Sequence, residues 1–210
     1  MKERPILFSA PMVRAILAGQ KTQTRRIVKP QPDLVYGSIP ARFTPDDQRL
    51  GRIGEVIRCP FGQPGDRLWV KETTLKVEDH GYEGPVYAES DDGRACLSGG
   101  LAPSDDDITE VEPWEIKKRP SIFMPRSMAR IILEVVDVRI EKLHDISAAD
   151  CIAEGAPGGH GAIPGYAYNA TPQEHYRHIW TSINGAASWE ANPWVWVIEF
   201  NPRTPGDETR

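Results

Sequence analysis

Hydrophobic and polar positions alternate most clearly along residues 129–143, ARIILEVVDVRIEKL. Such alternation is typical of a β-strand that buries one face. Apolar residues occupy odd positions as far as Val135 and even positions from Val138. One extra residue moves every later side chain to the opposite face of a strand, so this change of phase predicts a β-bulge or bend near Val136 and Asp137.

Other stretches with a strand pattern are shorter. Residues 65–73, GDRLWVKET, alternate and place Glu72 in line with core-facing positions at the end of the strand. Residues 192–200, NPWVWVIEF, have almost no polar break, which is typical of a strand buried on both faces. Further strands are predicted at ILFS (6–9), KTQTRRIV (21–28) and GPVYAE (84–89).

Three stretches instead have a helical spacing of apolar residues. PMVRAILAG (11–19) follows Ser9 as N-cap and ends at Gly19, which predicts a left-handed cap there. ISAADCIAEGA (146–156) has Ser147 as N-cap and Gly155 as its stop. The third helix is TPQEHYRHIWTSI (171–183), with an apolar stripe at Tyr176, Ile179, Trp180 and Ile183.

Short strands interrupted by short helices predict an α+β fold, a small mixed β-barrel of about five or six strands with short peripheral helices. No linker divides the chain into two balanced halves, so a single domain is predicted over residues 1–201. Stretches rich in proline, glycine or acid are interpreted as loop insertions at about 30–64, 74–120 and 157–170, and 202–210 as a C-terminal tail.

The charge is unevenly distributed along the chain. The formal net charge is -5, yet residues 1–30 contain seven Lys or Arg and one acid, and residues 117–130 contain five and none. Residues 78–115 carry twelve acids against Arg94. The net charge argues against indiscriminate coating of nucleic acid, whereas two basic segments together fit a phosphate backbone. Solvated charged faces are the alternative interpretation.

Composition excludes several classes of protein. The chain begins without the apolar segment of a signal peptide, and no apolar run approaches the roughly 18 residues of a membrane span. We therefore expect a cytoplasmic protein with no membrane partner. Cys59, Cys96 and Cys151 stand far apart and are odd in number, which indicates neither a disulfide framework nor a zinc site. We predict no cofactor and no metal.

The stretch AGQKTQTRRIVK, residues 18–29, holds four cations and no acid. Arg25 and Arg26 are like charges that lower the pKa of Lys21, as a base requires, and Thr24 is a nucleophile only if such a base reaches it. In an ideal strand Lys21 and Thr24 point to opposite faces, so this chemistry requires a turn before the strand. Alternatively, the threonines are simply strand formers and Lys21 is a solvated turn residue.

GQKTQTRR matches the signature G-x-K-x-x-x-x-R of the ASCH family at Gly19, Lys21 and Arg26. GDRLWVKET, MPRSMARIILEVVDVRIEKLHDIS, ADCIAEGA and WVWVIEF follow in the order seen in that family. The chain therefore resembles the ASCH family, particularly a longer form found in bacteria and their phages. The resemblance implies a PUA-like fold, in which a cleft beside the helix that precedes the signature binds RNA or a modified nucleoside or nucleotide.

Some compact ASCH proteins are amidohydrolases that remove the acetyl group of N4-acetylcytidine. Carried over by motif, this activity implies Lys21, Thr24 and Glu154 as catalytic residues: Lys21 takes the Thr24 hydroxyl proton as Thr24 attacks the amide carbonyl, and Glu154 orients the lysine or shuttles a proton. The remaining predicted ligand-binding residues are Gly19, Thr22, Arg25, Arg26, Glu72 and Arg126.

Alternatives stay open at several of these positions. Glu72 is either a rival carboxylate for acid–base chemistry or a group paired with a basic residue at the end of its strand. Arg119, Arg126 and Arg130 either reach the cleft or lie in a solvated loop. His175 and His178 have a metal-like spacing without an evident third ligand. The functional alternatives to the amidohydrolase are a non-catalytic RNA-binding module and a metal-dependent ribonuclease.

Overall fold

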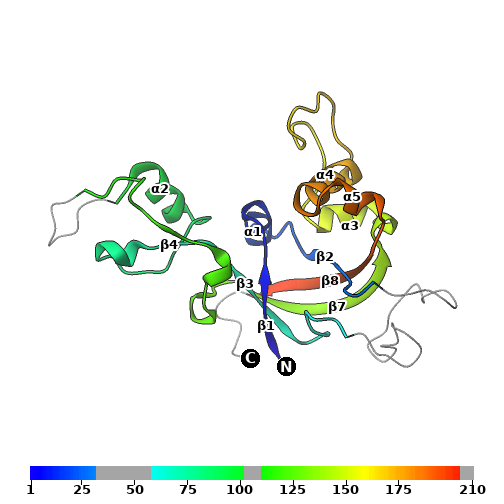
Figure 1. The fold of residues 1–210 in the computed structure, drawn as a ribbon, viewed down its shortest axis with the longest axis horizontal. Helices are drawn as coiled ribbons and strands as arrows, with labels where there is room; N and C mark the ends of the chain where they lie inside the picture. Colours follow the sequence, from blue (N-terminus) through cyan, green and yellow to red (C-terminus); the bar gives the residue numbers. More distant parts are fainter. Residues whose placement is uncertain (32–57, 102–109, 204–210) are drawn as a thin grey trace.

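The computed structural model describes residues 1–31, 58–101 and 110–203 (Figure 1). These residues form an α+β fold, as predicted. The strands are β1 (Glu3–Leu7), β2 (Gln23–Ile27), β3 (Arg67–Lys71), β4 (Thr74–Leu75), β5 (Val86–Tyr87), β6 (Lys118–Arg119), β7 (Ile132–Lys142) and β8 (Trp194–Arg203). The α-helices are α1 (Ala10–Leu17), α2 (Asp91–Gly99), α3 (Ala148–Ala153), α4 (Pro172–Asn184) and α5 (Ala186–Glu190). Short 3-10 helices lie at Val77–His80, Ser121–Phe123, Arg126–Met128 and Leu143–Asp145.

Five strands form one mixed sheet in the order β1-β3-β7-β8-β2. β1 and β3 are parallel and the other neighbours are antiparallel. The sheet curves, with β7 as its longest strand (Figure 1), but β1 and β2 remain its two edges. The predicted closed barrel is therefore wrong, because the two edge strands do not pair with each other through their backbones. Instead, the Arg26 side chain of β2 donates a hydrogen bond to the Leu7 carbonyl of β1 at 2.8 Å.

The predicted bulge in the long strand is confirmed. Val135 pairs with Phe200 and Asp137 pairs with Glu199, so Val136 has no opposite residue. Val136 is 48% exposed, whereas Val135 and Val138 are both buried. The bulge therefore keeps both halves of β7 packed on the core although their phases differ.

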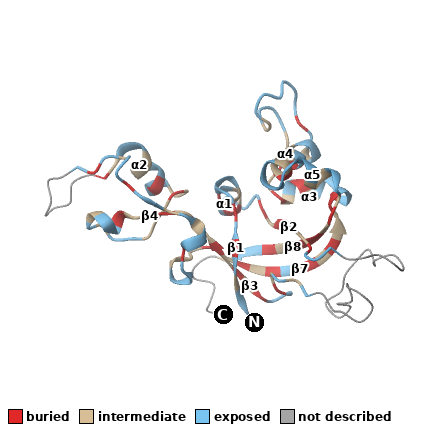
Figure 2. Cartoon of the chain, in the orientation of Figure 1, coloured by how far each residue is buried: buried red, intermediate tan, exposed pale blue. Residues whose placement is uncertain are grey.

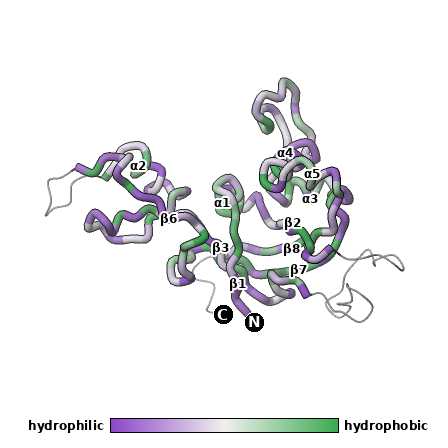
Figure 3. Tube along the Cα trace, in the orientation of Figure 1, coloured by the Kyte–Doolittle hydropathy of each residue, from purple (hydrophilic) through white to green (hydrophobic). Residues whose placement is uncertain are grey.

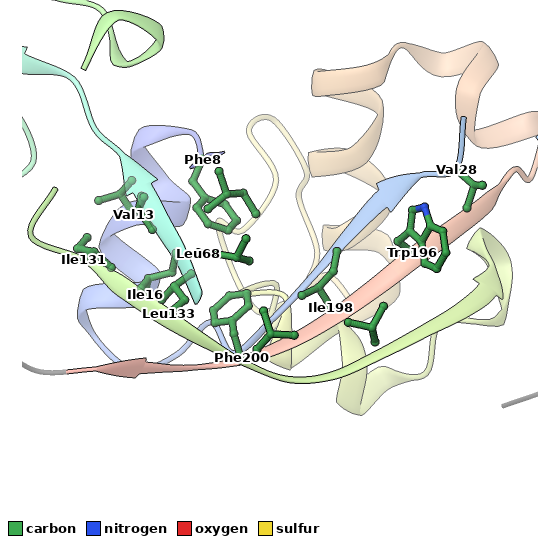
Figure 4. Close-up of a cluster of buried hydrophobic side chains, with 14 of the residues drawn as sticks. Phe8, Val13, Ile16, Val28, Leu68, Ile131, Leu133, Trp196, Ile198 and Phe200 are labelled. Carbon is green, nitrogen blue, oxygen red and sulfur yellow. The ribbon is translucent and has the colours of Figure 1, made fainter. Parts of the chain in front are cut away.

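The main hydrophobic core lies between α1 and the curved sheet (Figure 4). Val13 and Ile16 of α1 point toward β3, β7 and β8, and Trp196 and Phe200 supply the largest buried rings. Hydrophobic residues are concentrated along α1 and β8, whereas β1 begins with hydrophilic residues (Figure 3). A second cluster fills the other face of β8, where Val195 and Val197 meet α3 and α4, so the central part of β8 is buried on both faces as predicted.

The predicted insertion at 74–120 folds as a small lobe beside the main sheet (Figures 1 and 2). Its described residues form a second sheet, in the order β5-β4-β6, and α2. They also bury a hydrophobic cluster of their own, formed by Leu75, Val77, Ala88, Leu101, Val111 and Ile116. The described part of this insertion therefore forms a unit with a core of its own, which the acidic and turn-rich sequence did not indicate.

The helix boundaries follow the predicted caps. Ser147 accepts from the Asp150 amide in a capping box, and Gly19 has the left-handed φ of +69°. Ser9 occupies the N-cap position of α1, although its side chain makes no capping hydrogen bond. Most of the predicted insertion at 30–64 and of the tail at 202–210 lies outside the described residues, and β8 continues through Arg203 into that tail.

Candidate functional site

A cavity of about 660 Å³ lies where the end of β1, the edge strand β2, the Ser121–Phe123 turn and α4 meet. Its wall combines rings with cations. The rings belong to Phe8, Phe61, Tyr176, Trp180 and Trp196, and the cations to Arg25, Arg26, Lys29 and Arg58. Among the described residues of the wall, Glu154 is the single acid. Burial raises the pKa of Tyr176 well above its ordinary value, so its hydroxyl stays protonated.

Lys21 and Glu154, which are 133 residues apart in the sequence, form a buried ion pair at this site. The Lys21 ammonium donates to Glu154 Oε2 at 2.8 Å, to the Glu154 carbonyl at 2.9 Å and to the Gln23 carbonyl at 2.8 Å. Lys21 has no exposed surface, and Glu154 is 5% exposed. The three donors of the ammonium thus meet three acceptors, which stabilises the charged lysine inside the protein.

Two helix ends bring this pair together. Gly19 turns the chain from α1 toward β2, and Gly155, with φ of +86°, ends α3 directly after Glu154. A Cβ atom at Gly155 would lie 3.3 Å from the Ala15 Cβ, so α3 approaches α1 closely at this position. The Thr22 amide donates to the Ala153 carbonyl at 2.9 Å, which fixes the end of α3 against the start of β2.

Burial lowers the pKa of Lys21, and the charge and hydrogen bond of Glu154 oppose this effect. The cations Arg26 and Arg25 lower it further, with smaller effects. The sequence interpretation had the direction right but named the neighbouring arginines as the cause, because it had no means of showing that Lys21 lies beneath α3.

Thr24, the predicted nucleophile, lies apart from this ion pair. Its side chain is fully buried, and its hydroxyl accepts a hydrogen bond from Arg26 at 2.9 Å. No hydrogen bond of the described residues joins Thr24 to Lys21, which agrees with their placement on opposite faces of the strand pattern. Of the three predicted catalytic residues, the cavity wall includes Glu154 alone.

Arg25 and Arg26 follow one another on β2 and reach opposite sides of the strand. Arg26 lies over the Phe8 ring, 5.2 Å from its centroid, and donates to the Leu7 carbonyl. Arg25 is 2% exposed; its Nη2 donates to Glu141 at 3.0 Å, and its Nη1 donates to the Gln23 side chain at 2.5 Å. Both arginines line the cavity.

Sequence reasoning missed the polar side chains behind Arg25 and the aromatic wall. Arg139 and Glu141 pair with each other and lie beside Asp150 and Arg25. Their signal was visible as charged residues alternating with the apolar ones after the bulge in β7. The position of Phe61 in the wall had no comparable signal, because it depends on how distant segments fold together.

The remaining predicted ligand-binding residues lie away from the cavity. Glu72 is buried and accepts two hydrogen bonds from Arg130, at 2.9 and 3.1 Å, which is the structural alternative considered from the sequence. Arg126 pairs with Glu3 at 2.9 Å, and Arg119 pairs with Glu78. Gly19 serves as the cap of α1. Thr22 lines a separate, smaller cavity of about 370 Å³.

The two histidines on α4 have no metal-binding partners in the described part of the chain. His175 accepts from the Gly158 amide at 3.3 Å, and burial lowers its pKa, with a further contribution from His178. Within residues 1–31, 58–101 and 110–203, no group of three or more His, Cys, Asp or Glu side chains could hold a metal ion. The same ranges contain no helix long and apolar enough to cross a membrane.

Comparison with protein-family models, with curated proteins and with solved structures finds no match to this chain. The likeness to the ASCH family therefore stays a prediction that rests on the motifs themselves.

Proposed function

We propose that the chain binds RNA or a modified nucleoside in the cavity beside the G-x-K-x-x-x-x-R motif. The observation that carries this proposal is the composition of the cavity wall: five aromatic rings, four cations and one buried carboxylate. Rings offer stacking surfaces to a base, and cations suit its phosphate. A volume of about 660 Å³ is in the range of pockets that enclose a small ligand.

The cations divide by depth, which suggests an orientation for the ligand. Lys29 and Arg58 are exposed, whereas Arg25 is buried near Glu154. Phosphate groups are strongly hydrated, so they fit the exposed cations, and a flat base fits the enclosed rings. The ligand therefore enters base first in this proposal.

We also propose that the fold is PUA-like and of the ASCH type. Two motifs that carry the resemblance meet at one point, since Lys21 of the signature contacts Glu154 of ADCIAEGA. The contact supports the proposal because the two motifs lie 133 residues apart in the sequence, and a shared site requires the fold to bring them together.

A second candidate function is hydrolysis of an exocyclic amide on the bound base, of the N4-acetylcytidine type. The lowered pKa of Lys21 and the place of Glu154 on the cavity wall favour it. Attack by Thr24 would require Arg26 to release the hydroxyl and Lys21 to turn away from its three acceptors. The non-catalytic RNA-binding module needs no such rearrangement, and nothing in the described residues favours the metal-dependent ribonuclease.

Equilibrium binding tests the proposed function. Wild-type protein is titrated with ribonucleoside monophosphates and with a short mixed-sequence RNA, and N4-acetylcytidine is incubated with it to detect acetate release. Arg26→Ala removes a cation of the cavity wall and is expected to weaken binding about tenfold or more. Arg126→Ala, which removes an exposed cation away from the cavity, is the matched control and leaves binding within about twofold. Absence of binding by wild type, or equal losses in both variants, contradicts the proposal.

A further inference from the structure

Three exposed apolar side chains lie together at one side of the cavity mouth. Leu7 and Ile122 line the cavity, and Phe123, the next residue in the chain, is 68% exposed. Lys71 connects them, because it pairs with Leu7 across β1 and β3 and its ammonium donates to the Ile122 carbonyl. Single exposed apolar residues are common on proteins, whereas several beside a cavity indicate a surface that a ligand or a partner covers.

The backbone that presents Phe123 is held from below. It forms the 3-10 helix Ser121–Phe123, in which the Phe123 amide donates to the Pro120 carbonyl at 2.9 Å. Met124 follows directly and is buried, and its sulfur accepts from the Glu72 amide at 2.9 Å. The buried methionine and the rigid proline fix this turn between them, so the fold holds the Phe123 ring at the surface.

Lys71 places a positive charge beside the same turn. An ammonium has three donors, and among the described residues the Ile122 carbonyl takes one of those of Lys71 while no acid forms an ion pair with it. Arg119 and Arg126, which flank the turn in the sequence, are instead paired with Glu78 and Glu3. Lys71 therefore keeps donors and charge for an anionic group of a ligand.

We infer that the Ser121–Phe123 turn and Lys71 form a second nucleotide subsite outside the cavity. Successive side chains of a 3-10 helix are about 120° apart, so Phe123 points away from the cavity that Ile122 lines. It meets the neighbour of the enclosed base, which stacks on the ring, and Lys71 binds a phosphate between the two nucleotides. This inference rests on the proposed function and narrows its ligand to a single strand of RNA, because a free nucleoside has no neighbouring base.

The length of the ligand gives the first test. Wild-type protein is titrated with the four ribonucleoside monophosphates and with mixed-sequence RNA trinucleotides. The trinucleotides are expected to bind about tenfold or more tightly than the best monophosphate, because a second stacked base and a second phosphate contribute. If a monophosphate binds as tightly as the trinucleotides, the inference fails while the proposed function stands for a nucleotide. If neither binds, the proposed function itself fails.

Variants of Phe123 separate stacking from other effects of length. Phe123→Ala is expected to weaken trinucleotide binding about fivefold or more and to leave monophosphate binding within about twofold. Phe123→Tyr keeps a flat ring and is expected to bind like wild type, whereas Phe123→Leu is apolar without a ring and is expected to bind like Phe123→Ala. Tyr168→Ala, which removes a ring that is 74% exposed in the 157–170 loop, is the matched control and leaves both affinities unchanged. Unchanged trinucleotide binding in Phe123→Ala, or an equal loss for the monophosphates, overturns the inference.

The salt dependence of trinucleotide binding tests Lys71. In Lys71→Gln the slope of the logarithm of the binding constant against that of the salt concentration is expected to be smaller by about 0.7, the value for one phosphate of a single strand. Lys142→Gln is the matched control: Lys142 also donates to a backbone carbonyl, that of Asn192, and lies over a ring, that of Trp194, but at the far end of β7. This control keeps the wild-type slope. An unchanged slope in Lys71→Gln would contradict a phosphate at Lys71.

Discussion

At the scale of single residues, the site depends on a buried pair of opposite charges. Lys21 is fully enclosed and Glu154 nearly so, and the charge of each is compensated by the charge of the other. Lys21 was identified from the family signature and Glu154 from its resembling segment, whereas composition and spacing alone favoured a solvated lysine. Burial could not be predicted from the local sequence, because α3, which encloses Lys21, comes more than a hundred residues later.

Lys21→Ala is expected to lower the free energy of unfolding by about 3–5 kcal/mol, because it leaves the Glu154 carboxylate buried without its cation. Urea denaturation measures the effect. The matched control is Arg177→Ala: Arg177 pairs with Glu190 on the surface, with side chains 56% and 70% exposed, so the loss is below about 1 kcal/mol. A similar small loss in both variants would show that Lys21 is not the buried partner of Glu154.

The thiol of Cys59 is expected to react slowly with iodoacetamide. Burial raises its pKa to about 11, above the ordinary value, so at pH 8 the folded protein holds the unreactive thiol and little thiolate. Mass spectrometry of the labelled protein should show the rate of Cys59 modification still rising between pH 9 and about 11, and much faster labelling at pH 8 in denaturant. A rate that levels off near pH 8.5 in folded protein would contradict this.

At the scale of elements, patterns that are local in the sequence predicted the structure well. The change of phase in 129–143 became the bulge in β7, and the predicted N-cap Ser147 begins α3. The two-residue strands β4 and β6 could not be predicted, since so short a strand is defined by its partner and has no period of its own.

Ser147→Ala tests how firmly α3 holds the site. The hydroxyl caps the helix by accepting from the Asp150 amide at 3.1 Å, so its loss is expected to lower the free energy of unfolding by about 1 kcal/mol. Ser182→Ala on α4 is the control, because that hydroxyl donates to the Ile179 carbonyl of its own helix and caps nothing. Chemical denaturation compares the two variants, and a loss no larger than that of Ser182→Ala would exclude the capping role.

At the scale of the whole molecule, the sequence indicated the α+β class, but the closure of the sheet depends on how its edges meet. β1 and β2 are the two edges of the sheet, and the Arg26 side chain of β2 donates to the Leu7 carbonyl of β1, so the edge of β2 has no backbone partner strand beside the cavity. The uneven distribution of charge along the sequence corresponds to different parts of the structure. Four cations line the cavity, whereas the lobe formed by the insertion at 74–120 carries an excess of acids in its sequence.

The cations of the cavity wall predict that RNA binding weakens as the salt concentration is raised, because salt competes with them for the phosphates. For single strands the logarithm of the binding constant falls by about 0.7 per decade of salt for each phosphate that is neutralised. Arg58→Ala, which removes an exposed cation at the cavity, is expected to reduce the slope by about that amount. Arg94→Ala in α2 of the lobe is the control and leaves the slope unchanged. Fluorescence anisotropy of a labelled RNA at several salt concentrations gives the slopes, and an unchanged slope in Arg58→Ala would contradict phosphate binding there.

The central claim is that a base lies among the rings of the cavity, and photo-crosslinking measures this most directly. A short RNA with 4-thiouridine is irradiated with the wild-type protein, and the modified peptides are identified by mass spectrometry. The account predicts crosslinks in the peptides that contain Phe8, Phe61, Tyr176 or Trp180, which line the cavity. Crosslinks confined to rings outside the cavity, such as Trp114 of the lobe, which is 79% exposed, would contradict it.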